Sequence, residues 1–223
     1  GSHEDLEVRE IEPPGQPEEG QVKVDVVARG IQFSDLVRIA GDYQDKSGFP
    51  FVVGGDGAGV VVETGVGVEN ISVGQKVLVN SGCVEQINVS SRSVTPIPEG
   101  VDMNIAASFR NNYATAYYGM QRANLQAGET LLVHGAAGGV GLAAVDIGKL
   151  YGATVIGTAS SDEKLAVVKK LGADHVVNYT DGFRDEVKEL TGGRGVDVIY
   201  DPVGGDVFDE SMRCIAPFGR ILI

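Results

Sequence analysis

Residues 130–141 read TLLVHGAAGGVG, and this stretch determines the architecture of the second half of the chain. Leu131–Val133 predicts a buried strand, Ala136–Gly141 forms a turn, and an apolar segment from Leu142 to about Leu150 predicts a helix. The turn matches the dinucleotide fingerprint G-x-G-x-x-G, with Ala136 in the first glycine position. A strand before the turn and a helix after it are the context that this motif requires.

The glycines of this turn have separate expected roles. Gly138 lets the backbone approach a pyrophosphate, and Gly141 lets the helix pack closely on the strand. Amide groups at the helix N-terminus carry partial positive charge and face the phosphates. We therefore expect a nicotinamide dinucleotide to bind at Ala137, Gly138, Gly139 and Val140.

Short apolar strands alternate with helices after the fingerprint, which predicts a parallel, doubly wound sheet. The expected strands are residues 154–159, 176–179, 197–201 and 219–223, and the expected helices are residues 161–171, 182–190 and 206–215. A complete dinucleotide-binding sheet has six strands. Because the sequence stops after the fifth, we expect an incomplete Rossmann sheet; if the native chain ends at Ile223, the fifth strand would be an exposed apolar edge.

The end of the second strand of this sheet predicts the type of cofactor. NAD-binding forms carry an acid there, about 20 residues after the glycines, that holds the ribose 2′-hydroxyl. This chain has Ser160 and Ser161 instead, while Asp162 and Glu163 suit the start of the next helix. The Ser160 hydroxyl and the Lys164 ammonium would suit a 2′-phosphate, which favours NADPH. The alternative is that Lys164 is a solvated helix residue.

The first hundred residues follow a different pattern. Short strands are expected at residues 22–28, 57–63, 75–79 and 86–89, with turns between them, as in a compact antiparallel barrel. Pro96–Gly100 then forms a linker, and residues 102–122 predict a helix. We expect a barrel domain over residues 1–104 and a dinucleotide-binding domain over residues 105–223.

Composition excludes several classes of partner. The 223 residues carry a net charge of −13, which argues against nucleic acid and anionic membrane surfaces. No run approaches the roughly 20 apolar residues that span a bilayer. The first residues are polar and acidic, so no signal peptide is expected.

The few thiols and imidazoles favour a metal-free protein in a reducing compartment. Cys83 and Cys214 lie far apart, so a disulfide framework is not expected, and a cytoplasmic location is the simplest interpretation, with the mitochondrion left open. His3, His134 and His175 form no cluster at zinc spacing with the cysteines. We expect no zinc, and structural roles for His134 and His175.

The order of these parts resembles the medium-chain dehydrogenase/reductase superfamily, and more narrowly its zinc-free, zeta-crystallin-like quinone oxidoreductases. The resemblance implies a GroES-like barrel followed by a Rossmann sheet. The blocks that carry it are Gly30–Tyr43, Phe49–Val61, Asn111–Met120, Asn124–Lys149, Leu171–Tyr179 and Thr191–Phe208.

The resemblance implies catalytic roles for three residues. Gly30–Asp35 matches the family motif G-x-N-x-x-D in the cleft between domains, with Gln32 in place of asparagine near the nicotinamide. Tyr43 matches a tyrosine that faces the substrate cleft and could orient a quinone oxygen or donate a proton; a turn or core role is the alternative. Asn112 and, for cofactor binding, Thr115 match a block whose polar groups approach the nicotinamide end.

Further positions have implied roles in cofactor binding or in structure. Tyr179 matches a tyrosine beside the 2′-phosphate, and Val203 would place backbone by the adenosine. Asp56 stands where relatives often have glutamate, and we expect it to hold the barrel and a helix together by hydrogen bonds. Arg110 replaces a small or apolar residue, and the resemblance gives it no role.

The chemistry expected from this set is reduction of an electron-poor acceptor. Alcohol oxidation needs a metal or a strong base, and the sequence offers neither a metal cluster nor a Ser-Tyr-Lys set. Reduction of a quinone or enone by NADPH needs a well-placed hydride donor and only a modest proton donor. We expect this activity, a small-molecule acceptor and a homodimer in the full-length protein. An NADPH-binding structural protein or sensor, and an enoyl-thioester reductase, remain open alternatives.

Overall fold

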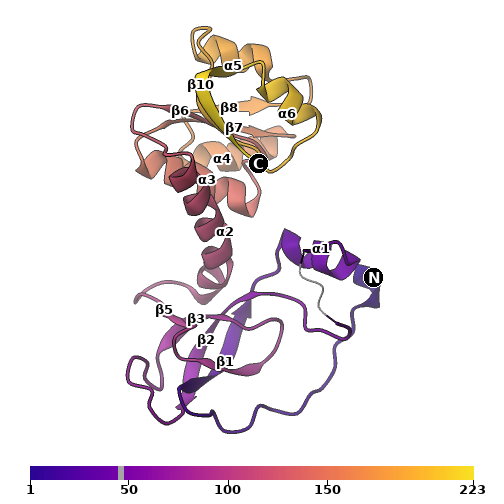
Figure 1. Ribbon diagram of the computed structural model, residues 1–223, viewed down its shortest axis with the longest axis vertical. Helices are drawn as coiled ribbons and strands as arrows, with labels where there is room; N and C mark the ends of the chain where they lie inside the picture. Colours follow the sequence, from indigo (N-terminus) through magenta and orange to yellow (C-terminus); the bar gives the residue numbers. More distant parts are fainter. Residues whose placement is uncertain (45–47) are drawn as a thin grey trace. The chain divides into compact units, whose positions relative to one another are not determined.

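The structure is a computed structural model that describes residues 1–44 and 48–223. The chain forms two compact units, an N-terminal unit over Gly1–Arg110 and a C-terminal unit over Asn111–Ile223. Helix α2 (Met103–Arg122) runs across this division, as Figure 1 shows. A domain boundary near residue 104 remains a prediction, and each unit is described by itself.

The N-terminal unit is built on an antiparallel sheet in the order β4-β1-β2-β3-β5. Val22 and Val24 on β1 are fully buried and alternate with half-buried residues, which is the predicted pattern of a strand with one face in the core. The bounds of the strands are β1 Gln21–Arg29, β2 Asp56–Thr64, β3 Lys76–Asn80, β4 Gln86–Ser90 and β5 Thr95–Pro96.

Two helical segments in this unit were not expected from the pattern. A short 3-10 turn covers His3–Asp5, and helix α1 covers Phe33–Ala40. The Asp35 carboxylate accepts a hydrogen bond from the Gln32 backbone N–H at 2.8 Å, which satisfies one donor at the start of α1. Gly41 ends the helix in the left-handed conformation, with a φ of 88°.

The C-terminal unit contains a parallel sheet in the order β10-β9-β6-β7-β8. This order places the fingerprint strand β6 at the centre and confirms the predicted doubly wound sheet. The elements are β6 Thr130–Val133, α3 Gly139–Leu150, β7 Thr154–Ala159, α4 Asp162–Leu171, β8 His175–Asn178, α5 Arg184–Leu190, β9 Val196–Tyr200, α6 Asp206–Ser211 and β10 Ile215–Leu222.

Neighbouring residues of β6 are buried on opposite faces of this sheet. Leu131 and Val133 pack in a cluster with residues of α2, α3 and α4. Leu132 packs in a second cluster with residues of α5 and α6. Because both faces are covered, the strand is apolar from Leu131 to Val133. Among the described residues, no helix is both long and apolar enough to cross a bilayer.

Two predicted helix bounds were wrong by three or more residues. Helix α3 begins at Gly139 rather than Leu142, because the glycine turn itself supplies the first helical turn. Helix α6 ends at Ser211 rather than residue 215. Beyond it, Ile215 already pairs with Val196 as the first residue of β10. Strand formation at Ile215 therefore overrides the helical pattern.

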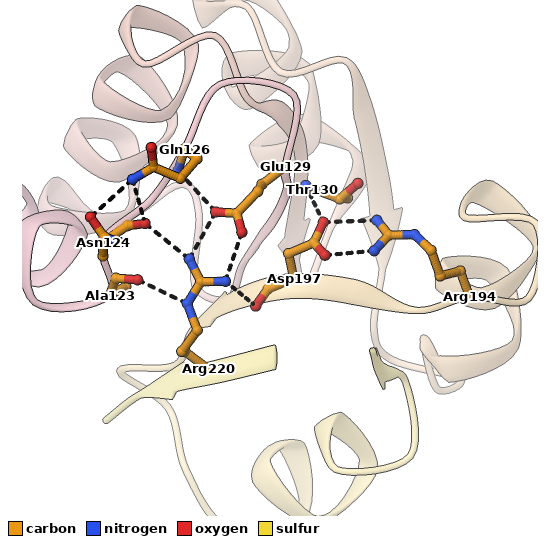
Figure 2. Close-up of polar contacts among 8 residues, drawn as sticks. All are labelled: Ala123, Asn124, Gln126, Glu129, Thr130, Arg194, Asp197 and Arg220. Carbon is orange, nitrogen blue, oxygen red and sulfur yellow. Dashed lines mark hydrogen bonds and ion pairs between the residues drawn. The ribbon is translucent and has the colours of Figure 1, made fainter. Parts of the chain in front are cut away.

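An arginine on β10 forms several hydrogen bonds with the loop that precedes the fingerprint strand (Figure 2). The Arg220 guanidinium donates to both carboxylate oxygens of Glu129, at 2.7 and 2.8 Å, and to the carbonyl of Ala123 at 2.8 Å. Beside it, Arg194 pairs with Asp197 at 2.5 and 2.7 Å. This network fixes the entry into β6.

Candidate cofactor site

The fingerprint turn is anchored to the two strands that flank β6. The His134 N–H donates to Tyr200 O on β9 and the Ala136 N–H donates to Thr158 O on β7, both at 2.9 Å. Gly135 adopts a φ of 56°, a conformation that favours glycine. The chain thus leaves β6 in a fixed direction and turns directly into α3.

The surroundings of Gly141 leave no room for a side chain, because the first turn of α3 packs on the turn that follows β6 rather than on the strand itself. A Cβ at this position would overlap the carbonyl oxygen of Gly135 and would lie 2.7 Å from the Cα of Ala136. Gly138 has a little more space, since a Cβ there would lie 3.3 Å from the same carbonyl oxygen. A close approach of the Gly138 backbone to a pyrophosphate remains a prediction.

The N-terminus of α3 presents backbone donors without a side-chain cap. Gly138 is the N-cap residue and has no side chain with which to accept from the helix. The N–H groups of Gly139, Val140 and Gly141 belong to the first helical turn, so they have no intrahelical carbonyl to bind. With the partial positive charge of the helix, these groups can hold a phosphate.

The side chain of Asn112 lies against this turn. A Cβ added to Gly139 would meet both terminal atoms of the Asn112 amide at 2.8 Å. The next residue of α2, Tyr113, donates its hydroxyl to Asp146 Oδ2 on α3 at 2.9 Å. Thr115 is exposed one turn further along α2. An approach of Asn112 and Thr115 to the nicotinamide end stays a prediction.

The residues expected around a 2′-phosphate gather where β7 and β8 end. Lys164 Nζ donates to Ser160 Oγ at 3.1 Å, and Ser161 caps α4 by accepting from the Lys164 N–H. The Tyr179 N–H donates to Ala159 O at 3.2 Å, which holds the chain after β8 beside the chain after β7. Ser160 and Lys164 therefore form a polar pair at the carboxyl edge of the sheet, whereas the Tyr179 ring is partly buried against the cluster that contains Leu132; its approach to a 2′-phosphate stays a prediction.

The loop after β9 lies against the fingerprint turn. Asp201 is buried, and its Oδ1 accepts hydrogen bonds from the backbone of Val203 at 3.0 Å and of Gly204 at 2.9 Å. A Cβ on Gly135 would touch Val203 Cγ2 at 3.5 Å. Val203, which was expected beside the adenosine, thus lies next to the fingerprint; its contact with a cofactor stays a prediction.

His134 has the structural role that was expected of it. The ring is fully buried; Nδ1 lies 2.8 Å from Thr158 Oγ1 and Nε2 lies 2.9 Å from Ser211 Oγ. Since Ser211 Oγ donates to Val207 O, it accepts from His134, and the proton resides on Nε2. Burial lowers the pKa of His134 to about 4, so the ring is neutral.

In the N-terminal unit, Gln32 and Asp56 form a pair that sequence reasoning missed. Gln32 Nε2 donates to Asp56 Oδ2 at 2.8 Å, and Asp56 is buried. The Asp56 carbonyl also accepts from the Gly30 N–H at 2.8 Å, in line with the structural role expected of this residue. The available signal was that Gln32 is one methylene longer, and Asp56 one methylene shorter, than the usual family residues.

Tyr43 is partly exposed, and its ring faces a cation. The guanidinium carbon of Arg38 lies 5.8 Å from the ring centroid, within the range of a cation–π interaction. A role of Tyr43 toward a substrate oxygen remains a prediction.

Over residues 1–44 and 48–223, no three His, Cys, Asp or Glu side chains come together as a metal-binding group. Cys83 and Cys214 are free thiols, and both ring nitrogens of His134 already have hydroxyl partners. The donors of these residues therefore do not fit a zinc ion.

Two family models match this chain. An alcohol dehydrogenase GroES-like domain matches residues 18–95, and a zinc-binding dehydrogenase domain matches residues 139–223. A quinone oxidoreductase-like protein 2 homolog from Nematostella vectensis is 43% identical over 209 residues, covering 91% of this chain and 57% of that protein. The chain thus spans less than two thirds of this curated relative.

Solved structures agree with these matches. Quinone oxidoreductase from Escherichia coli, solved in complex with NADPH, is 32% identical with a TM-score of 0.88, covering 99% of this chain and 69% of that chain. CurK enoyl reductase is 30% identical with a TM-score of 0.86, covering 95% of this chain and 68% of that chain. This chain belongs to the quinone oxidoreductase-like members of the medium-chain dehydrogenase/reductase family.

Proposed function

We propose that the protein is an oxidoreductase that binds NADPH and transfers hydride to a quinone or an enone. The observation that carries this proposal is the uncapped N-terminus of α3 at Gly139, preceded by the anchored fingerprint turn. Backbone donors at this position suit a diphosphate. The E. coli relative that was solved with NADPH supports the same cofactor.

The preference for NADPH over NADH is proposed to come from the Ser160–Lys164 pair. The two side chains are hydrogen bonded to each other at 3.1 Å, so a hydroxyl and an ammonium group lie side by side. A phosphate on the adenosine ribose would accept from both. Tyr179, whose backbone is bonded to Ala159, would add its phenol from the neighbouring strand end.

Bound NADPH would supply the hydride, and the chain's own residues would orient the reactants. Gln32 is a candidate to hold the nicotinamide amide, because its own amide is fixed by the buried Asp56. Tyr43 is a candidate proton donor to the reduced acceptor. A quinone or activated alkene needs little more than positioning and one proton.

The test is oxidation of NADPH followed at its absorbance band, with a panel of quinones, simple enones and a crotonyl thioester. We expect turnover with quinones or enones, and a lower kcat in Tyr43→Phe with an unchanged NADPH dissociation constant. Binding of NADPH without turnover on any acceptor would reject the catalytic proposal. It would favour a binding or sensor role.

Enoyl-thioester reduction is a second candidate, favoured by the likeness to CurK enoyl reductase. The same acceptor panel separates the two activities. A crotonyl thioester turned over more efficiently than every quinone and simple enone would select the thioester.

A further inference from the structure

The amide of Asn112 occupies the space that a side chain at Gly139 would fill. A Cβ there would lie 2.8 Å from Asn112 Nδ2 and Oδ1 and 2.9 Å from Cγ. Gly139 is the first residue of α3 and has no left-handed backbone conformation that would call for glycine. A side chain at position 139 would therefore have to displace the Asn112 amide from its place against the first turn of α3.

The direction of this contact places the amide beside the open end of the helix. In an α-helix each Cα–Cβ bond tilts toward the N-terminus. The Asn112 amide, 2.8 Å from that Cβ position, thus lies beside the first turn of α3, which carries the N–H groups of Gly139, Val140 and Gly141. These are the donors proposed above for a diphosphate.

A second contact between the same two helices holds Asn112 in this position. The Tyr113 hydroxyl donates to Asp146 Oδ2 at 2.9 Å. Burial, and then the hydrogen bond to Asp146, raise the pKa of Tyr113 to about 12, so the hydroxyl keeps its proton near neutral pH. Asp146 lies seven residues after Gly139, about two turns along one face of α3. Asn112 is thereby aligned with the first turn of α3.

We infer that the Asn112 side chain is a ligand for the diphosphate of the dinucleotide, with Nδ2 donating to a phosphate oxygen at the N-terminus of α3. Phosphate oxygens accept hydrogen bonds, and the amide nitrogen carries two N–H donors. The amide adds a directed donor without a charge. The inference rests on the proposed function, because the dinucleotide is its ligand.

The test compares two nucleotides with each of two variants. 2′-Phospho-ADP-ribose contains the diphosphate, whereas adenosine 2′-phosphate contains only the adenosine end. Asn112→Asp keeps the shape of the side chain but presents only acceptors and a negative charge. Asn112→Ala removes the group. Asn111→Asp is the matched control, since it adds the same charge one residue away on α2.

For 2′-phospho-ADP-ribose, calorimetric titration is expected to give at least tenfold weaker binding to Asn112→Asp and a few-fold weaker binding to Asn112→Ala. The dissociation constant of adenosine 2′-phosphate should change less than twofold in either variant. Asn111→Asp should change the dissociation constant of neither nucleotide by more than twofold. Melting temperatures verify that each variant is folded.

Two results would overturn the inference alone, with the wild-type protein still binding both nucleotides. One is Asn112→Asp binding 2′-phospho-ADP-ribose as tightly as wild type. The other is an equal loss for both nucleotides, which would reveal a packing role. A folded wild-type protein that binds neither nucleotide would instead reject the proposed function, and the inference with it.

Discussion

The Gln32 amide donates to the buried Asp56 carboxylate at 2.8 Å. Gln32 is one methylene longer than the asparagine usual in the family, and Asp56 is one methylene shorter than the usual glutamate, so the two differences in length compensate. Gln32→Asn should therefore break the hydrogen bond, and Asp56→Glu should overfill the site. Each single change is expected to lower the free energy of unfolding by about 1–2 kcal/mol. The double variant should recover most of that loss.

Urea unfolding of the four proteins forms a double-mutant cycle for this pair. A coupling free energy of about 1 kcal/mol or more in the favourable direction supports the exchange of lengths. Additive losses in the double variant would show that the two residues are independent.

The hydrogen bonds of Arg220 predict that even a conservative replacement of this residue lowers the stability of the fold. Lysine at this position cannot reproduce the fork that meets both oxygens of Glu129 and the Ala123 carbonyl. Arg220→Lys should lower the free energy of unfolding by about 1–2 kcal/mol, since the group is a third exposed and partly screened. Arg9→Lys, in an exposed pair with Glu7, is the control and should change little. Equal effects of the two changes would contradict the argument.

Because its pKa is lowered by burial, His134 is expected to make the folded protein less stable in acid. Burial lowers its pKa from 6.5 to about 4 in the folded protein, so between these values the unfolded chain binds the extra proton and stability rises with pH. Acidification from pH 6.5 to 4 should therefore remove about 3 kcal/mol through this residue. Urea unfolding across this range should show a shallower pH slope for His134→Gln than for wild type. An unchanged slope in His134→Gln would reject the assignment.

The fold was largely predictable because local pattern and tertiary structure agree. Residues 154–159 are a strand in the prediction and in the structure, since β-branched residues there are buried on both faces of the sheet. The failures occur where tertiary contacts decide. Residues 206–215 have a helical pattern, yet pairing of Ile215 with Val196 ends the helix at Ser211.

The candidate site was predictable at the level of motifs and less so at the level of pairs. The Ser160–Lys164 pair follows from a spacing of four residues at a helix start, which sequence shows directly. The contact of Asn112 with Gly139 joins residues from separate helices, so no local pattern contains it. Gln32 and Asp56 likewise lie far apart in the sequence, at the start of α1 and of β2, so no local pattern contains their hydrogen bond either.

Binding of the two reduced cofactors tests the central claim most directly. Lys164→Met removes the ammonium that donates to Ser160, and Lys170→Met removes another exposed charge from the same helix as a control. Fluorescence titration should give tighter binding of NADPH than of NADH to wild type, with the preference lost in Lys164→Met and kept in Lys170→Met. Tighter binding of NADH to the wild-type protein, or an unchanged preference in Lys164→Met, would contradict the account.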